Sequence, residues 1–204
     1  MKNKEQGPSP IALVDLDQST ADLEGAMRRD LEKMRDPINE PGLPHDLWDN
    51  TPPHIKERMK LIKSVPGWWK NLEPLKIGFD IVNLLRSKGL KIHALTKGPL
   101  LNAKAWEEKV IWCQQNLDLD KGDRMTITTD KGLVYGKILV DDYPGYAKRW
   151  LRHRPRGLVI MPLSKNNADY KHPQVVLYDG TNLEEVEQRV DETLEEMKKR
   201  EKRK

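Results

Sequence analysis

Short apolar runs recur along the chain, and segments with a helical hydrophobic pattern separate most of them. Several runs are apolar throughout instead of alternating with polar residues, which is typical of strands buried on both faces of a sheet. The runs cover residues 11–14, 92–95, 125–127, 138–140, 158–161 and 175–178. Strands that alternate with helices predict an α/β fold: a central, mostly parallel sheet with helices on both faces.

Helical periodicity marks the segments between these runs. Apolar residues within 77–85 fall on one face of a helix, and Gly89 stands where a glycine would end that helix. A further helix is predicted around 105–117. Residues 183–203 read as an amphipathic helix whose acidic start and basic end match the helix dipole.

The interval between the first and second runs is too long for a plain crossover between parallel strands. It contains a helical pattern at 20–34, a proline-rich region at 37–53 and a second helical pattern at 54–64. We interpret it as a small helical cap inserted after the first strand. The expected organisation is an α/β core at 1–20 and 75–182, a cap at 21–74, and a charged C-terminal helix and tail at 183–204.

Composition narrows the class of protein. The 36 Lys+Arg against 32 Asp+Glu give a formal net charge of +4. This small surplus leaves nucleic-acid binding open without favouring it, and it also suits a small phosphorylated ligand.

No apolar run could span a bilayer, so no membrane partner is expected. The N-terminus lacks the apolar segment of a secretory signal. The single cysteine, Cys113, excludes an intrachain disulfide, and a reducing cytoplasm is the expected location.

Polar groups follow four of the predicted strands directly. In chain order they are Asp15 and Asp17, Thr96 and Lys97, Lys131, and Asp141 and Asp142. Ligands of a parallel sheet bind at the carboxyl ends of its strands. Carboxylate oxygens bind a hard cation such as Mg²⁺, while a hydroxyl and an ammonium hold phosphate oxygens, so the set favours Mg²⁺-assisted phosphoryl transfer.

Each of these groups also has a purely structural interpretation. Asp17, Ser19 and Thr20 are all good N-caps for the following helix. Lys131 stands before a glycine and the two later aspartates stand before a proline, as turn residues do. Independent structural reasons for all four placements are less expected than one shared site, so the functional interpretation is favoured.

Five segments carry a resemblance to a known family. They are residues 15–24, 68–75, 105–109, 128–131 and 138–142. In this order they resemble the haloacid dehalogenase (HAD) superfamily of phosphohydrolases, and within it the 5′(3′)-deoxyribonucleotidase family. The resemblance covers about 11–142, with the cap only loosely matched, and implies a three-layer Rossmannoid core with the cap after the first strand.

The resemblance also implies a mechanism. Asp15 would be the nucleophile that forms an aspartyl-phosphate, and Asp17 would protonate the leaving group and then activate water. Mg²⁺ would bind the Asp15 carboxylate, the Asp17 backbone carbonyl and Asp142, with Asp141 as a further or an outer ligand. Thr96 and Lys131 would hold the phosphoryl group, and Lys97 could add a phosphate contact.

The sequence departs from the family pattern at positions that bear on substrate choice. Gln18 stands where relatives usually have glycine, and Lys97 stands where the animal enzymes have serine. Leu23 replaces a phenylalanine that packs on the base, and a leucine cannot stack as an aromatic ring does. Trp48 and Trp69 are the other candidates for contact with a base, and packing within the cap is their alternative role.

The predicted function is Mg²⁺-dependent hydrolysis of the phosphate monoester of (deoxy)nucleoside monophosphates, with a small phosphorylated substrate as the partner. An alternative enzyme would act on polynucleotide end phosphates or on another small phosphoester. An alternative of another class is a non-catalytic domain that binds nucleic acid or protein, with the basic C-terminal tail making the contacts. A homodimer is left open.

Overall fold

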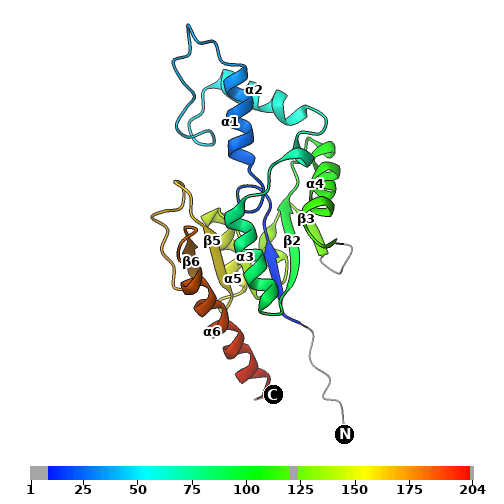
Figure 1. Cartoon of the computed structure of the whole chain (residues 1–204), viewed down its shortest axis with the longest axis vertical. Coiled ribbons are helices and arrows are strands. Elements are labelled where there is room, and N and C mark those ends of the chain that lie inside the picture. Colours follow the sequence, from blue (N-terminus) through cyan, green and yellow to red (C-terminus); the bar gives the residue numbers. More distant parts are fainter. Residues whose placement is uncertain (1–8, 120–123, 203–204) are drawn as a thin grey trace.

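The computed structural model describes residues 9–119 and 124–202, in which the six predicted strands are all present. They form one sheet in the order β3-β2-β1-β4-β5-β6, and each neighbouring pair is parallel. The strands are β1 (Ile11–Val14), β2 (Lys91–Lys97), β3 (Arg124–Thr128), β4 (Ile138–Val140), β5 (Leu158–Pro162) and β6 (Val175–Tyr178). The α/β fold is therefore confirmed (Figure 1).

The predicted helices are also present, with a few shifted ends, and a further helix lies between β4 and β5. They are α1 (Leu23–Lys33), α2 (Pro53–Ser64), α3 (Lys76–Ser87), α4 (Ala103–Asn116), α5 (Pro144–His153) and α6 (Leu183–Glu201), with short 3-10 helices η1 (Trp69–Asn71) and η3 (Lys131–Leu133). Gly89 adopts a φ of +78° just after α3, the left-handed conformation that glycine tolerates best. Residues 203–204, the end of the predicted tail, and 1–8, the start of the predicted core, lie outside the described residues.

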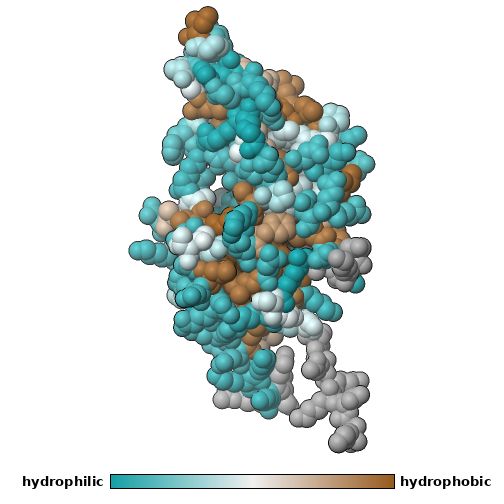
Figure 2. All heavy atoms as spheres, viewed as in Figure 1, coloured by the Kyte–Doolittle hydropathy of each residue, from teal (hydrophilic) through white to brown (hydrophobic). Residues whose placement is uncertain are grey.

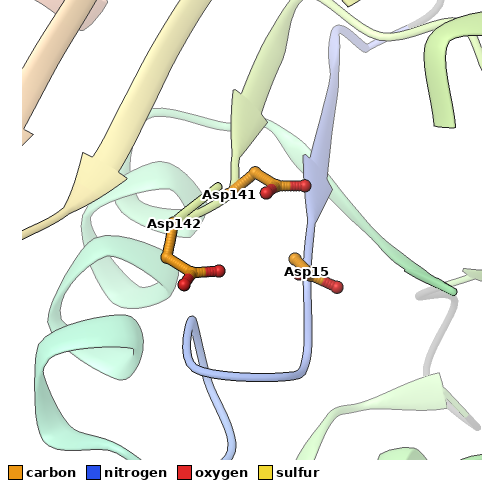
Figure 3. A group of neighbouring side chains, drawn as sticks. All are labelled: Asp15, Asp141 and Asp142. Atoms are coloured by element: carbon orange, nitrogen blue, oxygen red, sulfur yellow. The ribbon is translucent and has the colours of Figure 1, made fainter. Parts of the chain in front are cut away.

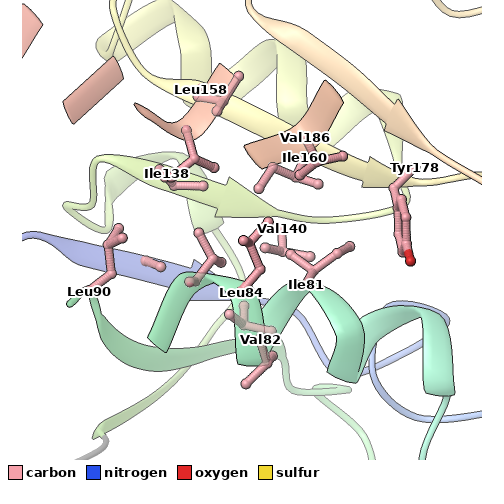
Figure 4. Packing of buried hydrophobic residues seen from close by; sticks show 14 of the residues in the cluster. Ile81, Val82, Leu84, Leu90, Ile138, Val140, Leu158, Ile160, Tyr178 and Val186 are labelled. Carbon is pink, nitrogen blue, oxygen red and sulfur yellow. The ribbon is translucent and has the colours of Figure 1, made fainter. Parts of the chain in front are cut away.

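Side-chain alternation along the strands divides the core into two layers. One face of the sheet buries Ala12, Val14 and their neighbours against α3 and α6 (Figure 4). The same face continues at Ala94 to α4, which packs on it through Trp112 and Cys113. The opposite face is covered by α5, which packs on alternate strand residues; these are Leu13, Leu95, Leu139, Val159 and Met161. Strands buried on both faces explain why the runs are apolar throughout.

A separate small cluster holds α1 and α2 together, and we call the part of the chain that carries these helices the cap. Its buried side chains are Met27, Leu31, Leu47, Ile55, Met59 and Ile62. Ala21 forms a β-bridge with Pro74, so the chain leaves toward the cap and returns from it at adjacent points. Figure 1 shows the cap beyond the carboxyl ends of the strands, on the side where a parallel sheet binds ligands.

The first cap helix begins later than its pattern predicts. Its N-cap is Asp22, whose Oδ1 accepts a 2.9 Å hydrogen bond from the Gly25 N–H. The alternative interpretation, in which Asp17, Ser19 or Thr20 caps this helix, is wrong, because the side chains of these residues bond elsewhere. Lys109 of α4 binds the Asp17 carboxylate. Thr20 donates to the Asp15 carbonyl at 2.8 Å, and Ser19 accepts from the Asp142 N–H at 3.1 Å.

The surface agrees with the charged composition. Figure 2 shows hydrophilic residues over most of one face of the molecule, with hydrophobic residues in small separate groups. Among the helices of the described ranges, none is long and apolar enough to cross a membrane.

Candidate active site

The sheet order explains how distant parts of the sequence meet. Strand β1 lies between β2 and β4, so the residues after these three strands emerge at one edge of the sheet. The Asp15 N–H donates to the Val140 carbonyl at 2.9 Å, which joins the ends of β1 and β4. Lys131 follows β3 and reaches the same point, with its Nζ 2.7 Å from Asp15 Oδ2 and 2.9 Å from Asp141 Oδ2.

The turn after Asp17 keeps a conformation suited to glycine although the residue there is glutamine. Gln18 has a φ of +59°, in the left-handed region that costs a non-glycine residue roughly 1 kcal/mol or more. Its side chain offsets part of this cost, because Gln18 Oε1 accepts a 2.6 Å hydrogen bond from the Glu24 N–H. The glutamine that departs from the family pattern therefore stands in a backbone conformation that glycine would adopt at lower cost.

Three carboxylates gather at this edge of the sheet. Asp15, Asp141 and Asp142 each offer an oxygen, and these oxygens lie within 4.8 Å of one another (Figure 3). Burial raises the pKa of Asp15 to about 7 against the opposing effect of Lys131, and burial and the neighbouring carboxylates raise the pKa of Asp142. Buried like charges repel unless a cation joins them, so this oxygen-only donor set fits a hard divalent ion such as Mg²⁺.

Lys131 is held in place from several sides. Its side chain is only 2% exposed, and its ammonium lies 4.5 Å from the centroid of the Tyr146 ring. Burial alone would lower the pKa of Lys131, but Asp141 and Asp15 outweigh that effect and raise it above its usual range. The group is therefore a fixed positive charge beside the carboxylate of Asp15.

A second buried lysine, Lys109, belongs to the site. The strand-end pattern does not predict it, because Lys109 lies on a helix. From α4 its Nζ donates to Asp17 Oδ2 at 2.6 Å, Thr96 Oγ1 at 2.9 Å and the Lys97 carbonyl at 2.9 Å. The sequence does carry one indication of its role: Lys109 lies on the same apolar face of the helix as Ala105 and Cys113. A lysine on the buried face of a helix needs polar partners there.

The other predicted residues divide between the wall of a cavity and the layer behind it. A cavity of about 680 Å³ opens at this edge, lined by Asp15, Asp17, Gln18, Leu23, Glu24, Asp46, Trp48, Asp49, Lys97, Lys131, Asp142, Tyr143, Tyr146, Ser164 and Asn166. Thr96 is fully buried next to Lys109, and Asp141 is fully buried next to Lys131.

Of the three residues predicted to contact the nucleoside, Leu23, Trp48 and Trp69, only Trp69 does not line the cavity. Its side chain is buried and packs with Leu72 and Trp112, and its indole N–H donates to the Lys63 carbonyl at 3.1 Å. The prediction that Trp69 contacts substrate is therefore corrected to a packing role. Leu23 and Trp48 do line the cavity.

Comparison with solved structures agrees with this fold. A hydrolase from Pseudomonas syringae has a similar structure, with a TM-score of 0.50 and 13% identity over 91% of this chain and 99% of that one. This likeness shows a shared α/β fold, with acidic residues at the strand ends of this chain. Together with the sequence comparisons that follow, it supports a phosphohydrolase of the HAD superfamily.

The sequence comparisons are more specific. The model of the "5' nucleotidase, deoxy (Pyrimidine), cytosolic type C protein" family matches residues 9–189, and the chain belongs to this family. It is a phosphoric monoester hydrolase of the 5'-nucleotidase type, which speaks against the non-catalytic alternative.

Curated relatives carry related names. The chain is 26% identical over 151 residues to a Bordetella pertussis protein named "Putative 5'(3')-deoxyribonucleotidase", covering 70% of this chain and 81% of that one. It is 28% identical over 138 residues to the human "5'(3')-deoxyribonucleotidase, cytosolic type", covering 64% and 69%.

Proposed function

We propose that this chain hydrolyses the phosphate monoester of (deoxy)nucleoside monophosphates with Mg²⁺ and through an aspartyl-phosphate on Asp15. The observation that carries the proposal is the pairing of Asp15 with Lys131 at 2.7 Å beside the buried Asp141 and the half-buried Asp142. This arrangement supplies a nucleophile, a fixed cation and a donor set for a divalent ion at one point. The names of the relatives support a nucleotide as the substrate.

Asp15 is positioned for attack on phosphorus. Its Oδ1 accepts a 2.7 Å hydrogen bond from the Leu16 N–H, which fixes the orientation of the carboxylate. In the first step an Asp15 oxygen forms a bond to phosphorus while the bond from phosphorus to the ester oxygen breaks. Asp15, Asp142 and the Asp17 carbonyl would hold Mg²⁺, with Asp141 beside them. The bound ion would reduce the repulsion between the Asp15 carboxylate and a phosphate dianion.

Asp17 has one carboxylate oxygen available for proton transfer. Its Oδ2 is bound by Lys109, while its Oδ1 is buried and has no hydrogen-bond partner among the described residues. In the first step Asp17 donates a proton to the departing ester oxygen. In the second, the Asp17 carboxylate takes a proton from water, the water oxygen bonds to phosphorus, and the bond to Asp15 breaks to release phosphate.

Three side chains would hold the transferred phosphoryl group. Lys131 offers positive charge beside Asp15, and Lys97 lines the cavity. Thr96 Oγ1 accepts its hydrogen bond from Lys109, so its own hydroxyl proton stays available for a phosphate oxygen. Leu23 and Trp48 form the part of the cavity wall suited to the nucleoside.

The test is phosphate release from a panel of nucleoside and deoxynucleoside monophosphates at equal concentration, with p-nitrophenyl phosphate beside them. Each assay is run with Mg²⁺ and with a chelator. We expect Mg²⁺-dependent release that the Asp15→Asn variant abolishes. Absence of release from every substrate with Mg²⁺ would refute the proposal, and release that survives in Asp15→Asn would refute the role of the nucleophile.

A further inference from the structure

Among the described residues, two lysines in the surroundings of the site have no carboxylate partner for the ammonium. Lys131 and Lys109 are paired with Asp15 and Asp17. Lys97 on the cavity wall and Lys63 at the end of α2 are different, because no carboxylate of the described residues lies within ion-pair distance of either ammonium. Lys97 is exposed, but Lys63 is half-buried, and a partly desolvated charge without a partner costs free energy.

The position of Lys63 is fixed by its backbone. Its carbonyl accepts hydrogen bonds from Trp69 Nε1 at 3.1 Å and from Asn102 Nδ2 at 3.0 Å, and Asn102 lies in the loop that follows β2. The Trp69 ring lies 4.8 Å from the Lys109 ammonium, which in turn binds Asp17. A short chain of contacts therefore joins the backbone of Lys63, at the end of α2, to the carboxylate of Asp17.

The segment that holds Lys63 is itself anchored to α4. Buried Glu108 accepts hydrogen bonds from the Gly67 N–H at 2.6 Å and from the Trp69 N–H at 3.0 Å. Glu108 precedes Lys109 in the sequence, so one turn of α4 fixes both the return from the cap and the carboxylate of Asp17. The backbone of Lys63 is thus fixed by several independent hydrogen bonds.

The charge balance of the site indicates a role for the positive charge of Lys63. Burial lowers the pKa of Lys63, and the carboxylate of Asp17 is near enough to oppose that effect in part. Lys131, Lys109 and one divalent ion balance the four carboxylates of the proposed site. A bound phosphate dianion adds two negative charges, which Lys97 and Lys63 would match.

We infer that Lys63 is a phosphate ligand supplied by the cap, which contacts the substrate's phosphate group on the side of Asp17. The inference rests on the proposed function and adds a residue that neither the motifs nor the strand ends reveal. Lys63 does not line the cavity in this structure. Its long side chain therefore has to turn toward the phosphate when substrate binds, which makes full phosphate affinity dependent on the cap.

The test compares variants of two lysines on the same helix. Lys63→Met and Lys63→Gln remove the charge, Lys63→Arg keeps it, and Lys56→Met is the matched control because Lys56 is exposed on α2. The readouts are the inhibition constant of inorganic phosphate and KM and kcat for p-nitrophenyl phosphate, all with Mg²⁺. The melting temperature checks the fold.

We expect the neutral variants to raise the phosphate inhibition constant and KM about tenfold, the effect of one charge-assisted hydrogen bond, with a smaller change in kcat. Lys63→Arg should recover most of the affinity, and Lys56→Met should stay within about twofold of wild type. Neutral variants that bind phosphate as tightly as the wild type or as Lys56→Met would overturn the inference. So would loss of folding in both neutral variants, because Lys63 would then be structural.

The same experiment separates this inference from the proposed function. If the wild-type protein releases no phosphate from p-nitrophenyl phosphate or from any nucleotide, the proposed function fails. If the wild-type protein is active and its Lys63 variants are unchanged, the function stands and the role of Lys63 fails alone.

Discussion

Replacing Lys109 with methionine tests how much the reaction centre depends on one buried charge. The side chain is 2% exposed and donates three hydrogen bonds, of which the 2.6 Å bond to Asp17 is an ion pair. Methionine keeps most of the stem and removes the ammonium, so packing against Trp69 changes little. The Asp17 Oδ2 then loses its partner, and the Asp17 Oδ1 already has none among the residues that the structure describes.

The expected cost follows from these contacts. Breaking one partner of a buried ion pair costs about 3–5 kcal/mol. The Asp17 side chain keeps 25% exposure, so water can replace part of the lost interaction and the low end of the range applies. We therefore expect Lys109→Met to lower the free energy of unfolding by about 3 kcal/mol.

The assay is urea unfolding followed by tryptophan fluorescence, since Trp69 and Trp112 lie beside Lys109. A double-mutant cycle with Asp17→Asn separates the pair from other effects, and contacting partners should couple by about 1–3 kcal/mol. A loss below about 0.5 kcal/mol, or additive effects of the two substitutions, would refute the assignment of Lys109 as the partner of Asp17. Phosphatase activity should fall with Lys109→Met, because the carboxylate of Asp17 is no longer oriented.

Three further outcomes follow from the site. Asp15→Asn should fold with an unchanged circular dichroism spectrum and show no phosphate release; any turnover above background contradicts its role as nucleophile. With Mg²⁺ chelated, stability should fall as pH rises from about 4 to about 7, because folded Asp15, whose pKa is raised to about 7, keeps a proton that the unfolded chain has lost. Asp15→Asn should reduce this slope, and an identical slope would count against the shift. Glu108→Gln should raise KM several-fold with little change in kcat, since a weaker hold on Gly67 and Trp69 loosens the position of Lys63; unchanged KM would show that the anchor is not needed.

The elements of the core could be predicted because their signals are local. Strands β1, β4 and β6 are short apolar runs bounded by polar residues, and the end of α3 is marked by Gly89. The convergence of strand-end residues could also be predicted, because a parallel sheet sends the carboxyl ends of its strands to one edge. The boundaries of the cap stay a prediction.

Other features depend on contacts that the sequence does not reveal. The start of α1 moved to Asp22 because Ser19 and Thr20 bond to Asp142 and Asp15. The role of Lys109 depends on which face of α4 is buried. Trp69 and Trp48 both stand in or next to the cap sequence, yet only Trp48 reaches the cavity, since the indole of Trp69 turns to Lys63.

The two amides held by Glu108 offer a native reporter of cap motion. Any outward swing of the segment from Gly67 to Trp69 must first break both of these hydrogen bonds. Hydrogen–deuterium exchange at the two amides would therefore rise with each excursion of the cap, without a label or a substitution. A slower exchange of these two amides on addition of phosphate would show by how much ligand binding reduces opening of the cap away from α4.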